Sequence, residues 1–217
     1  MIQCGNSIMA ATAAGGFRRF LGTGKSLSFV RGHTKMPGSR YSKAIERNLA
    51  EMQRAILNRT TLLGIERSIG VRALFLQVAY FALFNDYVAH CIKVFEEGKK
   101  AASFWYIYRT DQKIISAFAK KEKIDLATLV DVSTKLKHIR DKTHFHIDAD
   151  GVLDTKAIWR DAGLTGKQLS KAVDDAWAIL VHLQQQLSLP AVTIPAYYKV
   201  AHVHERVVAI EGGAFKS

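Results

Sequence analysis

The residues best suited to chemistry stand together between positions 135 and 148, in the sequence KLKHIRDKTHFHID. Within it, Arg140 and Asp141 are followed by His144 and His146. An imidazole with a pKa of about 6.5 can take up or release a proton at neutral pH. A guanidinium can stabilise the charge on phosphoryl oxygens. These residue types therefore suit acid–base chemistry at a phosphodiester.

Arg140 also occupies a position where a charge is unusual. At about 100° per residue, four residues of a preceding helix fall within about 40° of it: Leu126, Leu129, Ser133 and Leu136. The guanidinium thus continues an apolar helix face. It needs a carboxylate, a carbonyl, a phosphate or a water-filled cleft as its partner.

The elements that would position this segment are helices. Apolar periodicity predicts helices over residues 42–63, 71–95, 103–121 and 167–187, and one more that carries Arg140. The expected caps are Ser42 for the first of these, Thr165 for the last, and Asp125 for the helix that carries Arg140. The second is apolar nearly all round, so we expect it to be the central helix. The sequence predicts an all-α fold, an up-and-down bundle of four to five helices.

Both ends of the chain differ from this helical body. Residues 1–40 are rich in Gly, Ser, Ala and Arg, and we expect a flexible basic tail. The same segment fits an organelle-targeting peptide, or an over-long start with Met36 as the initiator. Residues 41–190 would form the bundle. Residues 191–217 would form a short extended tail with β-like stretches at 192–194, 197–200 and 203–210.

Composition narrows the classes of function. The net charge is +12, but residues 1–45 hold seven of the 31 basic residues and no acid, so the remainder carries only +5. Two cysteines are too few for a disulfide framework or a cysteine-based zinc site, which fits a reducing, cytoplasmic location. The longest apolar run is too short to span a bilayer, so we expect no membrane association.

One motif in this helical chain consists of Ile139-Arg140-Asp141-Lys142 and, after two residues, Phe145-His146-Ile147-Asp148. This motif resembles that of the HEPN superfamily, in which His follows Arg after a few positions. It is most similar to the abortive-infection, AbiU-like branch. The resemblance covers about residues 45–188. Two departures are Phe145, where that branch tends to have a small residue, and the additional His144.

The resemblance implies a HEPN-like bundle with metal-independent endoribonuclease activity and no cofactor. Two copies would form a homodimer in which Arg and His of both meet in one cleft. Arg140 would bind the scissile phosphate, and His146 would act as general acid and base. Asp141 would orient either the histidine or Arg140. A role as a toxin or in phage defence, with an antitoxin or other protein partner, is also implied. Since many members are inactive nucleic-acid-binding or dimerisation modules, that alternative stays open.

Helix geometry leaves the choice of histidine open. On an unbroken helix His144 lies about 40° from Arg140, whereas His146 lies about 120° away. A pairing of Arg140 with His146 therefore requires the helix to end or distort around residues 143–145.

Three basic side chains are candidates for contacts with RNA. Lys137 and Lys142 flank the motif, and Arg109 follows the aromatic cluster Phe104, Trp105, Tyr106 and Tyr108. Aromatic rings beside cations can stack on bases, although such a cluster also fits a core or a dimer face.

Other interpretations of the polar residues remain. His144-x-His146-x-Asp148 begins the His-x-His-x-Asp-His pattern of metallo-hydrolases, but Ala149 replaces the last histidine and no ligand set completes it, so we predict no metal site. Arg140, Asp141 and His146 could instead form a buried structural network. Asp86 and His90, four residues apart, could face the cleft or be satisfied locally.

Overall fold

The computed structural model describes residues 39–68, 73–144 and 155–214, and all regular structure in them is helical. The helices are α1 (Arg40–Glu66), α2 (Leu74–Phe95), α3 (Phe104–Thr110), α4 (Gln112–Glu122), α5 (Leu126–Ile139), the π-helical turn η1 (Arg140–His144), α6 (Thr155–Ala162), α7 (Gly166–Gln186) and α8 (Val200–Ala214). The all-α prediction is confirmed. The predicted tail, apart from its last two residues, lies outside the described part. In the described ranges, no helix combines the length and apolar character needed to cross a membrane.

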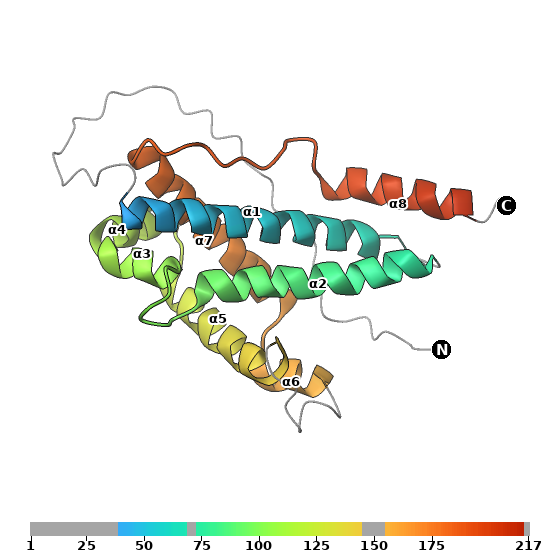
Figure 1. Cartoon of the computed structure of the whole chain (residues 1–217), viewed down its shortest axis with the longest axis horizontal. Helices are drawn as coiled ribbons and strands as arrows, with labels where there is room; N and C mark the ends of the chain where they lie inside the picture. The colour runs from blue at the N-terminus through green and yellow to red at the C-terminus, as the bar shows by residue number, and fades with distance from the viewer. Residues whose placement is uncertain (1–38, 69–72, 145–154, 215–217) are drawn as a thin grey trace.

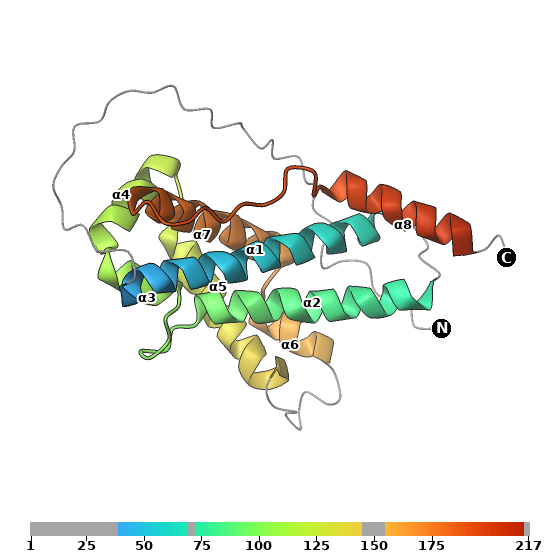
Figure 2. The same cartoon turned by 45° about the horizontal axis from the view of Figure 1, so that its top comes forward.

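The long helices surround one core. Helices α1 and α2 run antiparallel and side by side, α7 crosses behind α1, and α5 runs obliquely away from α2 toward α6 (Figures 1 and 2). The side chains at the centre come from α1, α2, α3, α5 and α7, and include Leu49, Met52, Tyr87, Phe95, Phe104, Leu136 and Leu180. Burying each such side chain contributes about 1.5–3 kcal/mol, so these contacts hold the helices in place.

Short polar side chains start three of these helices. Asp125 accepts a hydrogen bond from the Ala127 amide at 2.9 Å, and Thr165 accepts one from the Gln168 amide at 3.2 Å. The Gln168 side chain bonds back to the Thr165 amide, which completes a capping box. The caps predicted at Asp125 and Thr165 are confirmed. The cap predicted at Ser42 is wrong, because Ser39 caps α1 and accepts a hydrogen bond from the Ser42 amide, so the helix begins earlier than predicted.

The helix predicted over 103–121 is two helices. The backbone leaves the helical region at Asp111 (φ −132°, ψ 45°), which separates α3 from α4. Phe104 and Trp105 are buried, and the Trp105 indole N–H donates to Ser133 Oγ at 2.8 Å. These two aromatic residues therefore belong to the core and tie α3 to α5.

The expectation that the second helix is buried on all sides is wrong for its N-terminal half. Tyr87, Val88 and Phe95 are buried, but large apolar side chains between residues 74 and 81 face solvent. Apolar composition predicts burial only where another element covers the helix. Helix α2 extends beyond the helices that cover its C-terminal half (Figure 1).

The predicted strand-like stretch at 203–210 is wrong, because these residues lie in α8. Val and Ile favour strands, but Val207 is buried against Ile65 and Leu76, and this packing selects a helix. Gly64 allows α8 to approach α1, since a Cβ there would stand 2.5 Å from Val203 Cγ1. The other predicted β-like stretches, 192–194 and 197–200, form no strand either, since residues 189–195 have no regular structure and 196–197 form a turn before α8.

Candidate functional site

Helix α5 places Arg140 at its C-terminal end. Leu129, Ser133 and Leu136 are buried along one side of α5, as the periodicity predicted. The α-helical pattern stops at Ile139, and Arg140 begins η1. Isolated π-helical turns are frequent at functional sites because they change the direction of side chains without ending the helix.

The guanidinium of Arg140 is held by two carboxylates. Nε and Nη2 lie 2.8 Å and 2.7 Å from Oδ1 of Asp141, and Nη1 donates to Oε1 of Glu96 at 3.4 Å. The exposed fractions of the three side chains are 25% for Arg140, 49% for Asp141 and 41% for Glu96. Arg140 is therefore oriented by ion pairs at the surface rather than by a buried network.

A pocket of about 410 Å³ opens beside Arg140. It lies between the C-terminal end of α2, the segment that follows it and α5. Its lining is Ile92, Phe95, Glu96, Glu97, Gly98, Lys99, Ser133, Leu136, Lys137 and Arg140. An apolar floor with charged groups at its edge is the usual composition of a ligand site.

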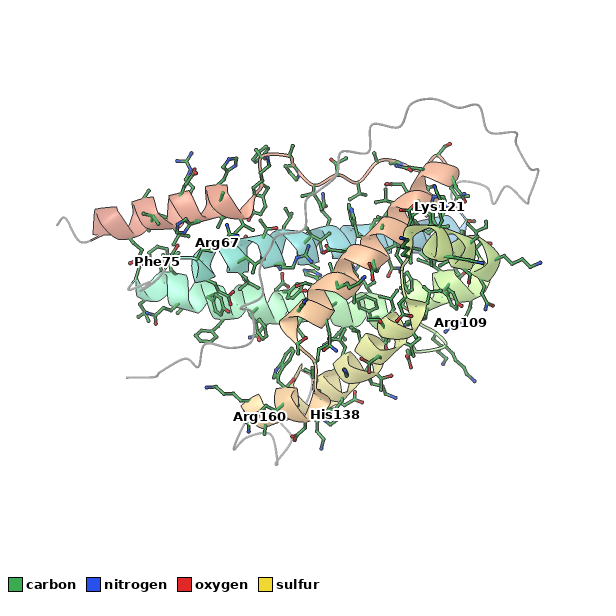
Figure 3. All side chains as sticks on the ribbon, turned by 180° about the vertical axis from the view of Figure 1, so that it is seen from behind. Arg67, Phe75, Arg109, Lys121, His138 and Arg160 are labelled. Atoms are coloured by element: carbon green, nitrogen blue, oxygen red, sulfur yellow. The ribbon has the colours of Figure 1, made fainter. Side chains whose placement is uncertain are left out.

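The structure brings only some of the predicted RNA-binding residues together. Lys137 lines the pocket with Arg140, and Lys142 is half-buried within η1. Arg109 is exposed on α3 and lies at a different part of the molecule from His138, which precedes Arg140 on the same helical segment (Figure 3). Arg109 therefore does not belong to the Arg140 site.

The two histidines of the motif are not placed equally. The backbone of His144 ends η1, and His146 lies outside the described residues, as do Phe145, Ile147 and Asp148. The α-helical pattern is distorted over Arg140–His144, which overlaps the residues 143–145 where a pairing of Arg140 with His146 requires a change. The choice between the two histidines stays a prediction.

The metallo-hydrolase pattern falls on the same segment and lies largely outside the described part of the chain. Among the described residues, no group of three His, Cys, Asp or Glu side chains is arranged to hold a metal ion.

A second polar cluster joins α1 to α2. Nδ1 of His90 lies 2.6 Å from Oε2 of Glu51, and Nε2 lies 3.1 Å from Oδ2 of Asp86. Oδ2 of Asp86 also accepts a hydrogen bond from the side-chain amide of Asn58 at 2.7 Å. His90 and Glu51 are buried whereas Asp86 is exposed. Of the two alternatives for Asp86 and His90, the structure therefore shows local satisfaction, in which the pair connects a buried carboxylate to the surface.

Basic side chains cover Glu51. Oε2 lies 3.5 Å from Lys93 Nζ, and Oε1 lies 2.9 Å from Arg47 Nε without an aligned hydrogen bond. Burial raises the pKa of Glu51. The hydrogen bond from His90 and the charges of Lys93, His90 and Arg47 outweigh that effect, so the pKa is lowered overall. Glu51 is therefore ionised at neutral pH.

Sequence reasoning missed Glu51. It lies among exposed-looking charges of α1, between Arg47 and Arg54, and the pattern placed it on the solvent side. The available signal was its spacing of four and three residues from two arginines, together with the Asp86–His90 pair on the next predicted helix. The sequence does not show how α1 and α2 are aligned, and only that alignment places Glu51 beside His90.

Cys91, next to His90 on α2, is not a candidate nucleophile. Cys91 is buried, and burial raises the pKa of its thiol to about 12. It therefore stays protonated and cannot act as a nucleophile at neutral pH.

Comparison of the chain with protein-family models, with curated proteins and with solved structures gave no match.

Proposed function

We propose that this protein is a metal-independent endoribonuclease of the HEPN type, with Arg140 as the residue that binds the scissile phosphate. The observation that carries the proposal is the position of Arg140. Its guanidinium is oriented by Asp141 and Glu96 at the edge of a pocket that Lys137 and Lys99 also line. An oriented guanidinium recognises a phosphate with less loss of side-chain entropy than a free one.

Arg140 keeps hydrogen-bonding capacity for a phosphate. A guanidinium has five N–H donors, and among the described residues the contacts to Asp141 and Glu96 involve three of its nitrogens, one N–H at each. The contact to Glu96, at 3.4 Å, is the longer one and so the easier one for a phosphate oxygen to replace. Lys137 would add a second positive charge on the same side of the pocket.

The proposed reaction is an internal transesterification. A histidine, His146 or alternatively His144, removes the proton of a 2′-hydroxyl, and the 2′-oxygen forms a bond to phosphorus. The bond from phosphorus to the 5′-oxygen breaks, and that oxygen takes a proton from an imidazolium. The products are a 2′,3′-cyclic phosphate and a 5′-hydroxyl. Arg140 would stabilise the charge that develops on the phosphoryl oxygens.

RNA cleavage by purified protein in the presence of a metal chelator tests the proposal. We expect Arg140→Ala to lose cleavage by at least about 100-fold, as removal of a transition-state donor does. His146→Ala and His144→Ala, made separately, identify the catalytic histidine. Lys121→Ala is the matched control, because it removes an exposed cation at a different part of the molecule (Figure 3).

Thermal unfolding of each variant separates catalysis from folding. Loss of cleavage with an unchanged melting temperature supports the proposal. The proposal fails if the wild type cuts no RNA, or if Arg140→Ala cuts as well as the wild type.

A non-catalytic RNA-binding or protein-binding module is the second candidate. It is favoured by the carboxylate partners of Arg140, since Asp141 and Glu96 already compensate its charge. RNA binding that weakens with salt and with Arg140→Ala, without cleavage, would indicate this function.

The HEPN resemblance also supports a cytoplasmic homodimer that acts as a toxin or phage-defence effector beside an antitoxin or other protein. Growth arrest on expression of the wild type, but not of Arg140→Ala, would support this role.

A further inference from the structure

Four large apolar side chains on the N-terminal half of α2 form an exposed surface that we call the α2 stripe: Leu74, Phe75, Val78 and Phe81. Their exposed fractions are 72%, 58%, 60% and 54%. The other exposed large hydrophobic residues among those described are scattered over α4, α5, α8 and the segment before α8. A gathered patch of this kind marks a surface that another molecule covers.

The spacing of the α2 stripe is that of a helix-pairing seam. Leu74, Val78, Phe81 and Asn85 follow one another at steps of four, three and four residues. This alternation places side chains along one line that faces a partner helix. Asn85 is exposed at the last of these positions, and a single asparagine in such a seam fixes the register of the pair.

The rest of the same α2 face shows what kind of element covers it. At about 100° per residue, Ile92 falls within about 40° of Leu74, Val78 and Phe81. Ile92 lines the same pocket as Leu136 of α5, and both belong to the buried core, so this face meets apolar helices where it is covered. Where α5 has diverged, the matching partner is again a helix with an apolar face.

The distribution of charge along the chain allows a second copy to approach the α2 stripe. The chain carries a net charge of +12, so most approaches of two copies are repulsive. Residues 73–85 contain no charged residue. Two copies can therefore meet along this segment without placing like charges opposite each other.

We infer that the α2 stripe is a self-association surface, on which α2 of a second copy of this chain packs about a two-fold axis. The same patch then serves on both subunits, as a two-fold interface requires. The proposed function also needs two copies. The inference is nevertheless drawn from the α2 surface alone, and its test measures mass rather than activity.

The test is size-exclusion chromatography with light scattering on the full chain at micromolar concentration. The wild type should have twice the 24.2 kDa mass of one chain. Val78→Glu and Phe81→Glu should each raise the dissociation constant by about 100-fold or more, because each copy would bury a charge in place of an apolar side chain. Both positions are exposed in the single chain, so circular dichroism should show unchanged helicity.

Val208→Glu is the matched control, since Val208 is a similarly exposed valine on α8. It should leave the dimer intact. A wild type with the mass of one chain overturns the inference and assigns the stripe to another occupant. A dimer that survives both stripe variants, or that Val208→Glu also disrupts, overturns it as well. A dimer that dissociates as expected but cuts no RNA supports the inference while the proposed function fails.

Discussion

The imidazole of His90 lies between two carboxylates, with Glu51 2.6 Å from one ring nitrogen and Asp86 3.1 Å from the other. The contact between His90 and Glu51 joins the middle of α1 to α2. Glu51 is almost fully buried, so it relies on this contact and on nearby basic side chains for compensation of its charge. Buried charges are retained only when such partners are present.

Glu51→Ala should lower the free energy of unfolding by about 3 kcal/mol, because it leaves the buried His90 and its basic neighbours without their central acceptor. Chemical denaturation measures this. Glu46→Ala, on the same helix and only partly buried, is the control and should change stability by about 0.5 kcal/mol or less. Equal effects of the two substitutions would contradict a special role for Glu51.

The pKa of Glu51 gives this contribution a pH dependence. The folded pKa lies below the ordinary value of 4.5, so the unfolded chain binds a proton at Glu51 more readily than the folded one. The stabilisation is fully present above about pH 4.5 and is lost as the pH falls through the lower folded pKa. The stability difference between wild type and Glu51→Gln should therefore shrink on acidification. A difference that stays constant from about pH 6 down to acid unfolding would exclude this linkage.

Glu96→Gln should strengthen RNA binding by about two- to fivefold, because it removes a negative charge beside Arg140 at a partly exposed position. Fluorescence anisotropy with a labelled RNA at low salt measures the change. Glu122→Gln, at the end of α4, makes the same charge change and should have little effect. If both variants bind RNA equally, Glu96 does not compete with RNA for Arg140.

Gly64→Ala should loosen the docking of α8 on α1. The new Cβ would meet Val203 at 2.5 Å, and relief of that overlap should cost about 1–3 kcal/mol. Amide hydrogen exchange should become faster in residues 200–211. Gly212→Ala is the control, because a Cβ there meets no atom within 4 Å and alanine favours the helix. Unchanged exchange in α8 of Gly64→Ala would show that the two helices do not pack closely.

Cys91 should resist alkylation in the folded protein. Its thiol is buried, and burial raises its pKa to about 12, so almost no thiolate forms at about pH 8. In a Cys4→Ser variant, mass spectrometry after iodoacetamide treatment should show no modification under native conditions and full modification in denaturant. Rapid native labelling would mean that the C-terminal part of α2 opens to solvent.

The sequence predicted what depends on neighbouring residues along the chain. Asp125 and Thr165 cap helices because a side-chain acceptor two or three residues before an amide is a local property. The apolar face that ends at Arg140 is equally local, and a carboxylate was among the partners expected for that guanidinium. That Glu96 supplies one of them depends on how α2 packs against α5, which no local pattern contains.

Where the prediction was wrong, contacts distant in sequence decided the outcome. Val203 and Val207 favour a strand by type, but their packing against α1 and α2 places them in a helix. Glu51 is buried where α1 packs against α2, and His90 of that facing helix contacts it. The exposed Leu74 shows the opposite case, an apolar residue that no described helix covers.

The π-helical turn after α5 means that the number of residues in the turn at Arg140 can change. Such a turn closes its hydrogen bonds over five residues instead of four, so it holds one residue more than an α-helical turn. Deleting a single residue from 141–144 would let α5 continue as a regular helix and would bring His146 one position nearer to Arg140 in the sequence. The number of residues between the arginine and the histidine can therefore change by one without a change in the helix that precedes them.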